Sequence, residues 1–208
     1  MRLSARLLIL SIAALASLAL LGAGSASATV LCKTATSPCT GGTYGAGTVL
    51  KTVLKEGEAA KFVPSLSICN ESAIELEVTN AGGFGVKVSG NVLGLTFAKC
   101  GSCPVSVLKK GTTFSIANNG GGNGNIEING VELTAPSLSC GAQHCVYAGS
   151  FATGITLVGG AMAMVDVEAS IPRTSGGFSC GTKIVWGATF EGPGYTVTSP
   201  EPLYVSEL

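Results

Sequence analysis

All eight cysteines of this 208-residue chain lie downstream of an N-terminal export signal, and this arrangement constrains the fold more than any other feature. The signal combines the basic residues Arg2 and Arg6, a long apolar run and the small-residue cleavage pattern Ala26-Ser27-Ala28. We therefore expect residues 1–28 to be a cleaved signal peptide and residues 29–208 to form one secreted domain. An even number of cysteines in an exported chain indicates a disulfide framework, because exported thiols become oxidised.

The composition favours β-structure and argues against several partners. Charged residues make up only 12% of the chain, and there are 30 glycines. Without the two signal arginines the mature chain has a slight acidic excess, so we expect no nucleic-acid partner. Beyond the signal, no apolar run approaches the roughly 20 residues that a membrane helix needs. The mature chain is therefore expected to have no membrane span and to be extracellular or periplasmic.

Alternating apolar and polar residues predict strands with one buried face. The segments 74–79 and 161–171 show this period-two pattern, and so does the segment 183–190, which places Ile184, Trp186 and Phe190 on one face. Helical periodicity is nearly absent after residue 28. We expect an all-β fold, an antiparallel β-sandwich stapled by disulfides.

Two dipeptides predict tight hairpin turns. Gly90-Asn91 fits a type II′ turn and Asn129-Gly130 fits a type I′ turn. Each predicted hairpin precedes a local pair of cysteines, so the two segments form a weak internal repeat. If the repeat reflects common origin, it indicates duplication of a hairpin-plus-cysteine-pair unit. The Gly/Asn-rich segment 118–125 between them is expected to be a surface loop.

Eight cysteines allow 105 connectivities, and we base the expected pairing on loop length. Near neighbours are cheapest to join, which leaves one long loop to be closed by the two remaining cysteines. In the chain-entropy model a loop of about 100 residues contributes about 4.7 kcal/mol, against about 3 kcal/mol for 15 residues. The expected disulfides are Cys32–Cys39, Cys100–Cys103, Cys140–Cys145 and Cys69–Cys180.

Asp166 and Glu168 are the best candidates for acid/base catalysis. They lie two residues apart on a predicted strand and therefore share its polar face. Two carboxylates can work as the acid and base of a polysaccharide hydrolase, but such a pair is more often a solvated face. The chain has one histidine, His144, and its cysteines suit disulfides better than zinc. We expect no metal and no cofactor.

Two further motifs resemble catalytic sequences. Cys100-Gly101-Ser102-Cys103 has the spacing of thiol–disulfide oxidoreductases, but a strand-like segment follows it where those enzymes have a helix. Thiol–disulfide exchange is therefore a second alternative function, behind a carboxylate-dependent hydrolase. Gly177-Phe178-Ser179-Cys180-Gly181 matches the nucleophile-elbow pattern without the strand before it and the helix after it, which indicates a chance match in a loop.

The aromatic residues give only a weak indication of a platform for sugar binding. Trp186 shares a face with apolar neighbours and is expected in the core. Tyr44, Tyr147, Tyr195 and Tyr204 fall near turns or chain ends, which favours a surface position. Asn70-Glu71-Ser72 fits the sequence required for N-glycosylation.

The export signal, the start Leu31-Cys32-Lys33, the segment from Cys39 to Tyr44-Gly45 and the paired cysteines resemble a group of uncharacterised secreted proteins of high-GC actinobacteria. That resemblance implies export and a cysteine-paired β-rich fold, and it implies no activity. Catalysis needs converging titratable groups, whereas binding needs loops on a stiff frame. We therefore expect a non-enzymatic binding or structural protein of the cell envelope or extracellular space, with an unknown extracellular or cell-wall ligand.

Overall fold

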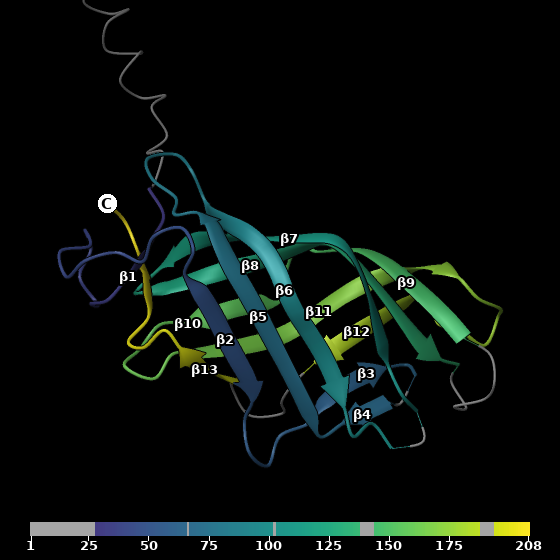
Figure 1. The fold of residues 1–208 in the computed structure, drawn as a ribbon. Helices are drawn as coiled ribbons and strands as arrows, with labels where there is room; N and C mark the ends of the chain where they lie inside the picture. The colour runs from purple at the N-terminus through teal and green to yellow at the C-terminus, as the bar shows by residue number, and fades with distance from the viewer. Residues whose placement is uncertain (1–27, 66, 102, 138–143, 188–193) are drawn as a thin grey trace, which may run out of the picture.

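The computed structural model describes residues 28–65, 67–101, 103–137, 144–187 and 194–208. In these ranges the regular elements are strands, and every strand pair is antiparallel (Figure 1). The strands are β1 (Val30–Cys32), β2 (Val49–Leu54), β3 (Ala60–Val63), β4 (Ser67–Cys69), β5 (Glu71–Asn80), β6 (Val88–Ala98), β7 (Ser106–Gly120), β8 (Asn123–Pro136), β9 (His144–Phe151), β10 (Ile155–Val158), β11 (Met164–Ser175), β12 (Lys183–Gly187), β13 (Tyr195–Ser199) and β14 (Tyr204–Ser206). The all-β, antiparallel expectation is confirmed.

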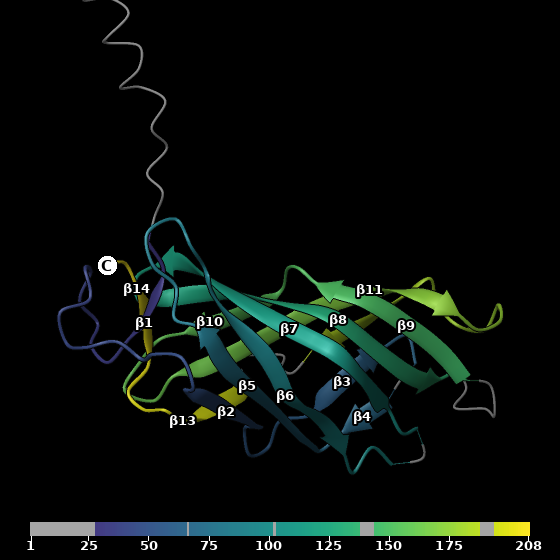
Figure 2. The same cartoon turned by 45° about the horizontal axis from the view of Figure 1, so that its top comes forward.

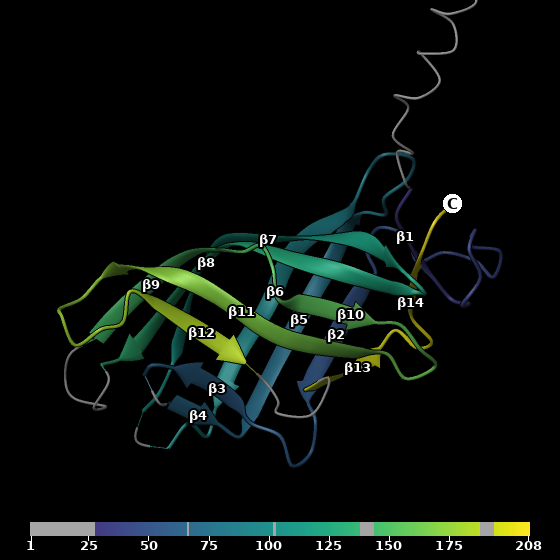
Figure 3. The same ribbon diagram turned by 180° about the vertical axis from the view of Figure 1, so that it is seen from behind.

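The main sheet closes on itself. Its strands are hydrogen-bonded in the order β10, β8, β7, β6, β5, β2, β13 and β11, and β11 pairs again with β10. Figures 1 and 3 show β2, β5 and β6 on one side of the molecule and β8, β10 and β11 on the other. The expected sandwich is not confirmed, because these two sides belong to one continuous sheet and not to two separate ones. They still face each other across a shared core, as sandwich layers do.

Shorter strands extend and close the ends of this sheet. β9 and β10 pair with the same strands, β8 and β11, so together they form one interrupted strand between them. β12, β3 and β4 continue the sheet beside β11. β1 and β14 form a separate two-stranded ribbon at the end of the molecule away from β9 (Figure 2).

The predicted turn at Gly90-Asn91 is wrong, because β6 runs straight through both residues. Gly90 instead permits a close approach between strands: a Cβ atom there would lie 1.8 Å from the carbonyl oxygen of Glu77 on β5. The same small residue that suits a turn therefore suits a position where two paired strands come unusually close.

The predicted turn at Asn129-Gly130 is also wrong, because both residues lie inside β8. Gly130 has a φ of +75° and sits where the pairing of β8 with β9 shifts register, so it forms a β-bulge. The turn between β7 and β8 is instead made by Gly121 and Gly122, with φ values of +62° and +85°. Most of the segment 118–125 is strand, and with neither predicted hairpin present the expected duplication is not confirmed.

The buried faces follow the predicted alternation. Ile74, Leu76 and Val78 are buried on β5, and the residues of β11 alternate in the same way. Trp186 is fully buried on β12, as expected, and its ring lies between 5.2 and 6.5 Å from four aromatic rings: Phe62, Phe97, Phe151 and Tyr195. Phe190, predicted to share the face of Trp186, lies outside the described residues.

The predicted surface position is wrong for two of the four tyrosines. Tyr147 and Tyr195 are buried, with side chains that are 1% and 0% exposed. Both lie on strands, β9 and β13, whose alternation points them into the core. Tyr44 and Tyr204 are partly exposed.

The disulfides differ from the expected pattern in all but one case. Cys32–Cys39 is confirmed. The predicted Cys69–Cys180, Cys100–Cys103 and Cys140–Cys145 pairs are wrong, because the structure joins Cys69 to Cys100 and Cys145 to Cys180. Cys103 is also disulfide-bonded, and Cys140 lies outside the described residues.

The Cys69–Cys100 bridge follows strand pairing and not loop length. Glu71 pairs with Ala98 in the β5–β6 register, and extending that register by two residues brings Cys69 opposite Cys100. Their Cα atoms lie 3.8 Å apart. The Cys145–Cys180 bridge joins β9 to the connection between β11 and β12. It passes close to Gly176, where an added Cβ would lie 2.6 Å from the Cys180 Sγ.

Candidate functional site

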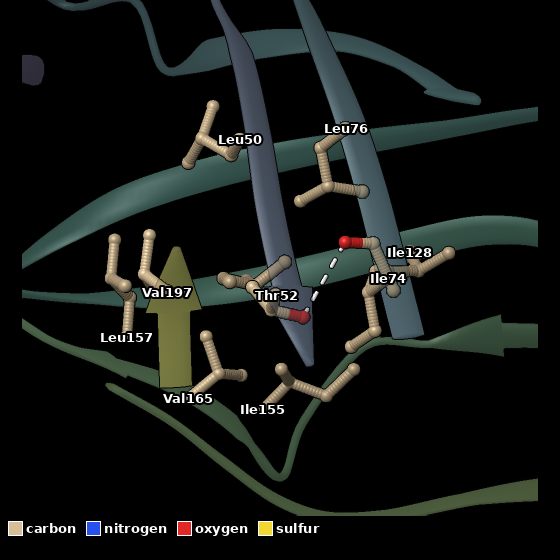
Figure 4. A pocket seen from close by; sticks show the side chains of 10 residues that line it. Leu50, Thr52, Ile74, Leu76, Ile128, Ile155, Leu157, Val165 and Val197 are labelled. Carbon is tan, nitrogen blue, oxygen red and sulfur yellow. Dashed lines mark hydrogen bonds between the residues drawn. The ribbon is translucent and has the colours of Figure 1, made fainter. Parts of the chain in front are cut away.

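The described residues on the inner face of the closed sheet are closely packed around a small cavity. A cavity of about 10 Å³ lies between the β2–β5 side and the β8–β10–β11 side (Figure 4). That volume is close to the minimum for one water molecule. Thr52 is the one polar residue among those described in its lining, and its hydroxyl donates to the carbonyl oxygen of Ile74 at 3.4 Å. The lining residues are Leu50, Thr52, Ile74, Leu76, Ile126, Ile128, Ile155, Leu157, Val165 and Val197.

A larger, open pocket lies where β2 ends and β5 begins, next to the end of β6. Its volume of about 310 Å³ is at the lower end of the range for small-molecule sites. The hollow arises because small residues stand side by side on the outer face: Ala73 pairs with Thr96, and Ala98 pairs with Glu71. The residues that line this pocket are Val53, Leu54, Asn70, Glu71, Ser72, Ala73, Thr96 and Ala98.

Ser72 connects this pocket to the core. Its side chain is almost buried, and its Oγ accepts a hydrogen bond of 2.8 Å from the hydroxyl of Tyr195. Burial raises the pKa of Tyr195 well above its usual value, and the bond to Ser72 and the nearby Trp186 indole offset this rise in part. Tyr195 is therefore neutral and remains a hydrogen-bond donor throughout the physiological range. The indole N–H of Trp186 has no hydrogen-bond partner in the described part of the chain.

The rim of the pocket is held in an unusual backbone conformation. Lys99 has a φ of +51°, in the left-handed region that residues other than glycine seldom occupy. Its side chain forms an ion pair with Glu71, and its carbonyl accepts a hydrogen bond from the Asn70 N–H at 3.3 Å. The neighbouring Cys69–Cys100 bridge ties the two strand ends together. Backbone outliers gather at functional sites more often than elsewhere, which makes this rim a candidate.

Asp166 and Glu168 lie apart from this pocket. They project from the outer face of β11, opposite to the buried Val165 and Val167, and they line neither of the two cavities described above. Asp166 stands opposite Thr156 on β10, and Glu168 stands opposite Gly187 on β12. The two carboxylates therefore lie on the outward-facing, polar side of β11.

The nucleophile-elbow match lies in the connection between β11 and β12. The guanidinium of Arg173 donates to the carbonyl oxygens of Gly177 and Cys180 at 2.7 and 2.6 Å. Together with the Cys145–Cys180 bridge, these contacts fix a loop on which Phe178 is fully exposed. The connection joins two strands, so the strand–turn–helix context of a nucleophile elbow is not present there.

Neither the cysteines nor the acidic residues assemble a metal site in the described ranges. No group of three or more His, Cys, Asp or Glu side chains is close enough there to hold an ion. Cys100 and Cys103 do not bond to each other, so the predicted dithiol motif is not formed. His144 begins β9 and is exposed. The same ranges contain no helix of the length and hydrophobicity needed to cross a membrane.

The sequence interpretation missed the open pocket as a site. It drew attention to Asn70, Glu71 and Ser72 as a glycosylation sequence, and these residues prove to form one wall of the pocket. The other wall comes from β6, some 25 residues later, and the pairing that joins the two is visible only in the fold. The chain matches no family model, no curated protein and no solved structure.

Proposed function

We propose that the protein is an exported, non-enzymatic binding protein of the cell envelope or extracellular space. Disulfides persist in oxidising compartments, and the three described bridges support a location outside the reducing cytosol. The N-terminal export signal supports the same location.

The observation that carries the binding role is the open pocket on a stiff frame. The pocket combines apolar lining with a few polar groups, which is the usual composition of ligand sites. The closed sheet, the Cys69–Cys100 bridge and the Glu71–Lys99 ion pair hold its walls in place in the absence of a ligand. A preformed site loses less conformational entropy on binding than a flexible one.

The binding role is tested by retention of the secreted protein on extracellular material. The mature protein is incubated with washed cell-wall fractions and with immobilised glycans, and its reduced and alkylated form serves as the unfolded control. We expect saturable retention that the control loses, and an N-terminal sequence that begins at Thr29. Equal retention of both forms, or no retention on any fraction, would contradict the proposal.

The carboxylate-dependent hydrolase remains an alternative because Asp166 and Glu168 share one exposed strand face. It predicts release of reducing sugar from wall or plant polysaccharide. Asp166→Asn and Glu168→Gln would abolish that activity and leave the unfolding transition unchanged. Activity that survives both substitutions would assign the reaction to other residues.

A further inference from the structure

We propose that the open pocket binds a neutral polyhydroxylated ligand, such as one sugar residue of a glycan. This inference rests on the proposed binding function and assigns its ligand class. It comes from the polar groups that line the pocket, from the charge balance of the rim and from the apolar surface of the lining.

Ser72 anchors the strand that forms one wall of the pocket. Its side chain lies on the core face of β5, in series with the buried Ile74, and its Oγ accepts a hydrogen bond from the Tyr195 hydroxyl. Ala73, the next residue, lies on the opposite face of the strand and lines the pocket. A buried contact therefore holds this wall from behind, and a wall held in place loses less conformational entropy when a ligand binds.

The polar groups of the pocket complement a ligand that both donates and accepts. Asn70 offers an amide with donors and an acceptor, Thr96 offers a hydroxyl, and Glu71 offers carboxylate oxygens. Sugar hydroxyls pair with all three kinds of group, whereas a purely anionic or purely cationic ligand would leave some of them unpaired. Groups left unpaired in a site cost affinity.

The charge balance favours a neutral ligand. Among the described residues that line the pocket, Glu71 alone is charged, and Lys99 forms an ion pair with it across the rim. Val53, Ala73 and Ala98 provide apolar surface against which the C–H face of a sugar ring can pack. The pocket is open to solvent, so a longer glycan could continue out of it.

The experiment uses the mature, disulfide-bonded chain made in a host without N-glycosylation, because a glycan on Asn70 would block the pocket. Backbone amide chemical shifts are followed by NMR during titration with methyl glycosides of glucose, galactose, mannose, arabinose and N-acetylglucosamine. Acetate and tetramethylammonium are the charged comparison probes. We expect shifts at Ser72, Ala73 and Thr96 with at least one methyl glycoside and none with the charged probes.

Two substitutions locate the site. Ala98→Phe fills the pocket from an exposed position at the end of β6 and should abolish the shifts, whereas Ala161→Phe, in the exposed turn before β11, should leave them unchanged. Thr96→Val, which removes a hydroxyl from an exposed position in the pocket lining, should weaken binding about 2- to 12-fold, the range for one lost hydrogen bond, without affecting the core.

The outcomes separate this inference from the broader proposal. Retention of Ala98→Phe on wall fractions, without any methyl glycoside shift in the parent chain, would overturn the pocket and keep the binding function. Shifts with a charged probe in place of the sugars would overturn the ligand class. Sugar shifts that persist in Ala98→Phe would place the site elsewhere, and an absence of both retention and shifts would overturn both proposals.

Discussion

The hydrogen bond between Tyr195 and Ser72 gives the sharpest test of how core and pocket are joined. The Tyr195 side chain is fully buried, and its hydroxyl lies 2.8 Å from the Ser72 Oγ. Ser72→Ala would leave that hydroxyl without an acceptor and without access to water, at a cost of about 1–3 kcal/mol. Tyr195→Phe removes the donor, and the small Ser72 hydroxyl that remains can rotate toward another acceptor, so the loss should be about 0.5–1.5 kcal/mol.

The double variant decides whether the two losses share one cause. Removing both partners leaves no unsatisfied hydroxyl, so Ser72→Ala/Tyr195→Phe should be more stable than the sum of the single losses predicts, by about 1 kcal/mol. Urea unfolding with intact disulfides, followed by the fluorescence of the single tryptophan, Trp186, measures each free energy of unfolding. The dependence on urea should be the same for all four proteins. Additive losses, or a neutral Ser72→Ala, would refute the reasoning.

Three further predictions concern the buried Tyr195, the close contact between β5 and β6, and a disulfide. Burial raises the pKa of Tyr195, so the folded chain keeps a proton that the unfolded chain releases at alkaline pH. The free energy of unfolding should therefore be constant up to a pH of about 10 and fall above it, by up to about 1.4 kcal/mol per pH unit. Tyr195→Phe should make this fall less steep. Gly90→Ala should prevent normal folding, judged by circular dichroism, because its Cβ would meet the Glu77 carbonyl oxygen at 1.8 Å. Cys145→Ala/Cys180→Ala opens a loop with a sequence separation of 35, so the free energy of unfolding should fall by about 3.8 kcal/mol or more in urea.

The alternation of apolar and polar residues was a sound guide to the strands. It identified the buried faces of β5, β11 and β12, because each of these strands has one face against the core and the other toward solvent. The turn signals were less reliable. A glycine beside an asparagine indicates a position where the chain has little space for a side chain or adopts an unusual φ. Gly90 meets the first need where β5 and β6 come close, and Gly130 meets the second at a bulge in β8. The local sequence therefore indicates a position that needs a small residue or a positive φ, but it does not indicate whether that position lies in a turn or within a strand.

The open pocket depends on three strands whose pairing the sequence does not reveal. Ala73 and Ala98 are ordinary small residues along the chain, and they make a hollow because β5 and β6 place them on the same outer face. The buried partner of Ser72 comes from β13, more than 120 residues away. A site built from such distant segments could be found only once the register was known.

The cysteines show the same dependence on register, and they show why a local energy argument failed. Closing a short loop costs the unfolded chain less entropy, which favours neighbours such as Cys100 and Cys103 as long as the chain is unfolded. Once β5 and β6 pair, however, Cys69 and Cys100 are held opposite each other, and the loop has already been closed by the sheet. The bridge then adds no further ordering to the native state, and it removes freedom from the unfolded chain. Sheet register thus decides the pairing, and the pairing in turn fixes the strand ends that form the rim of the pocket.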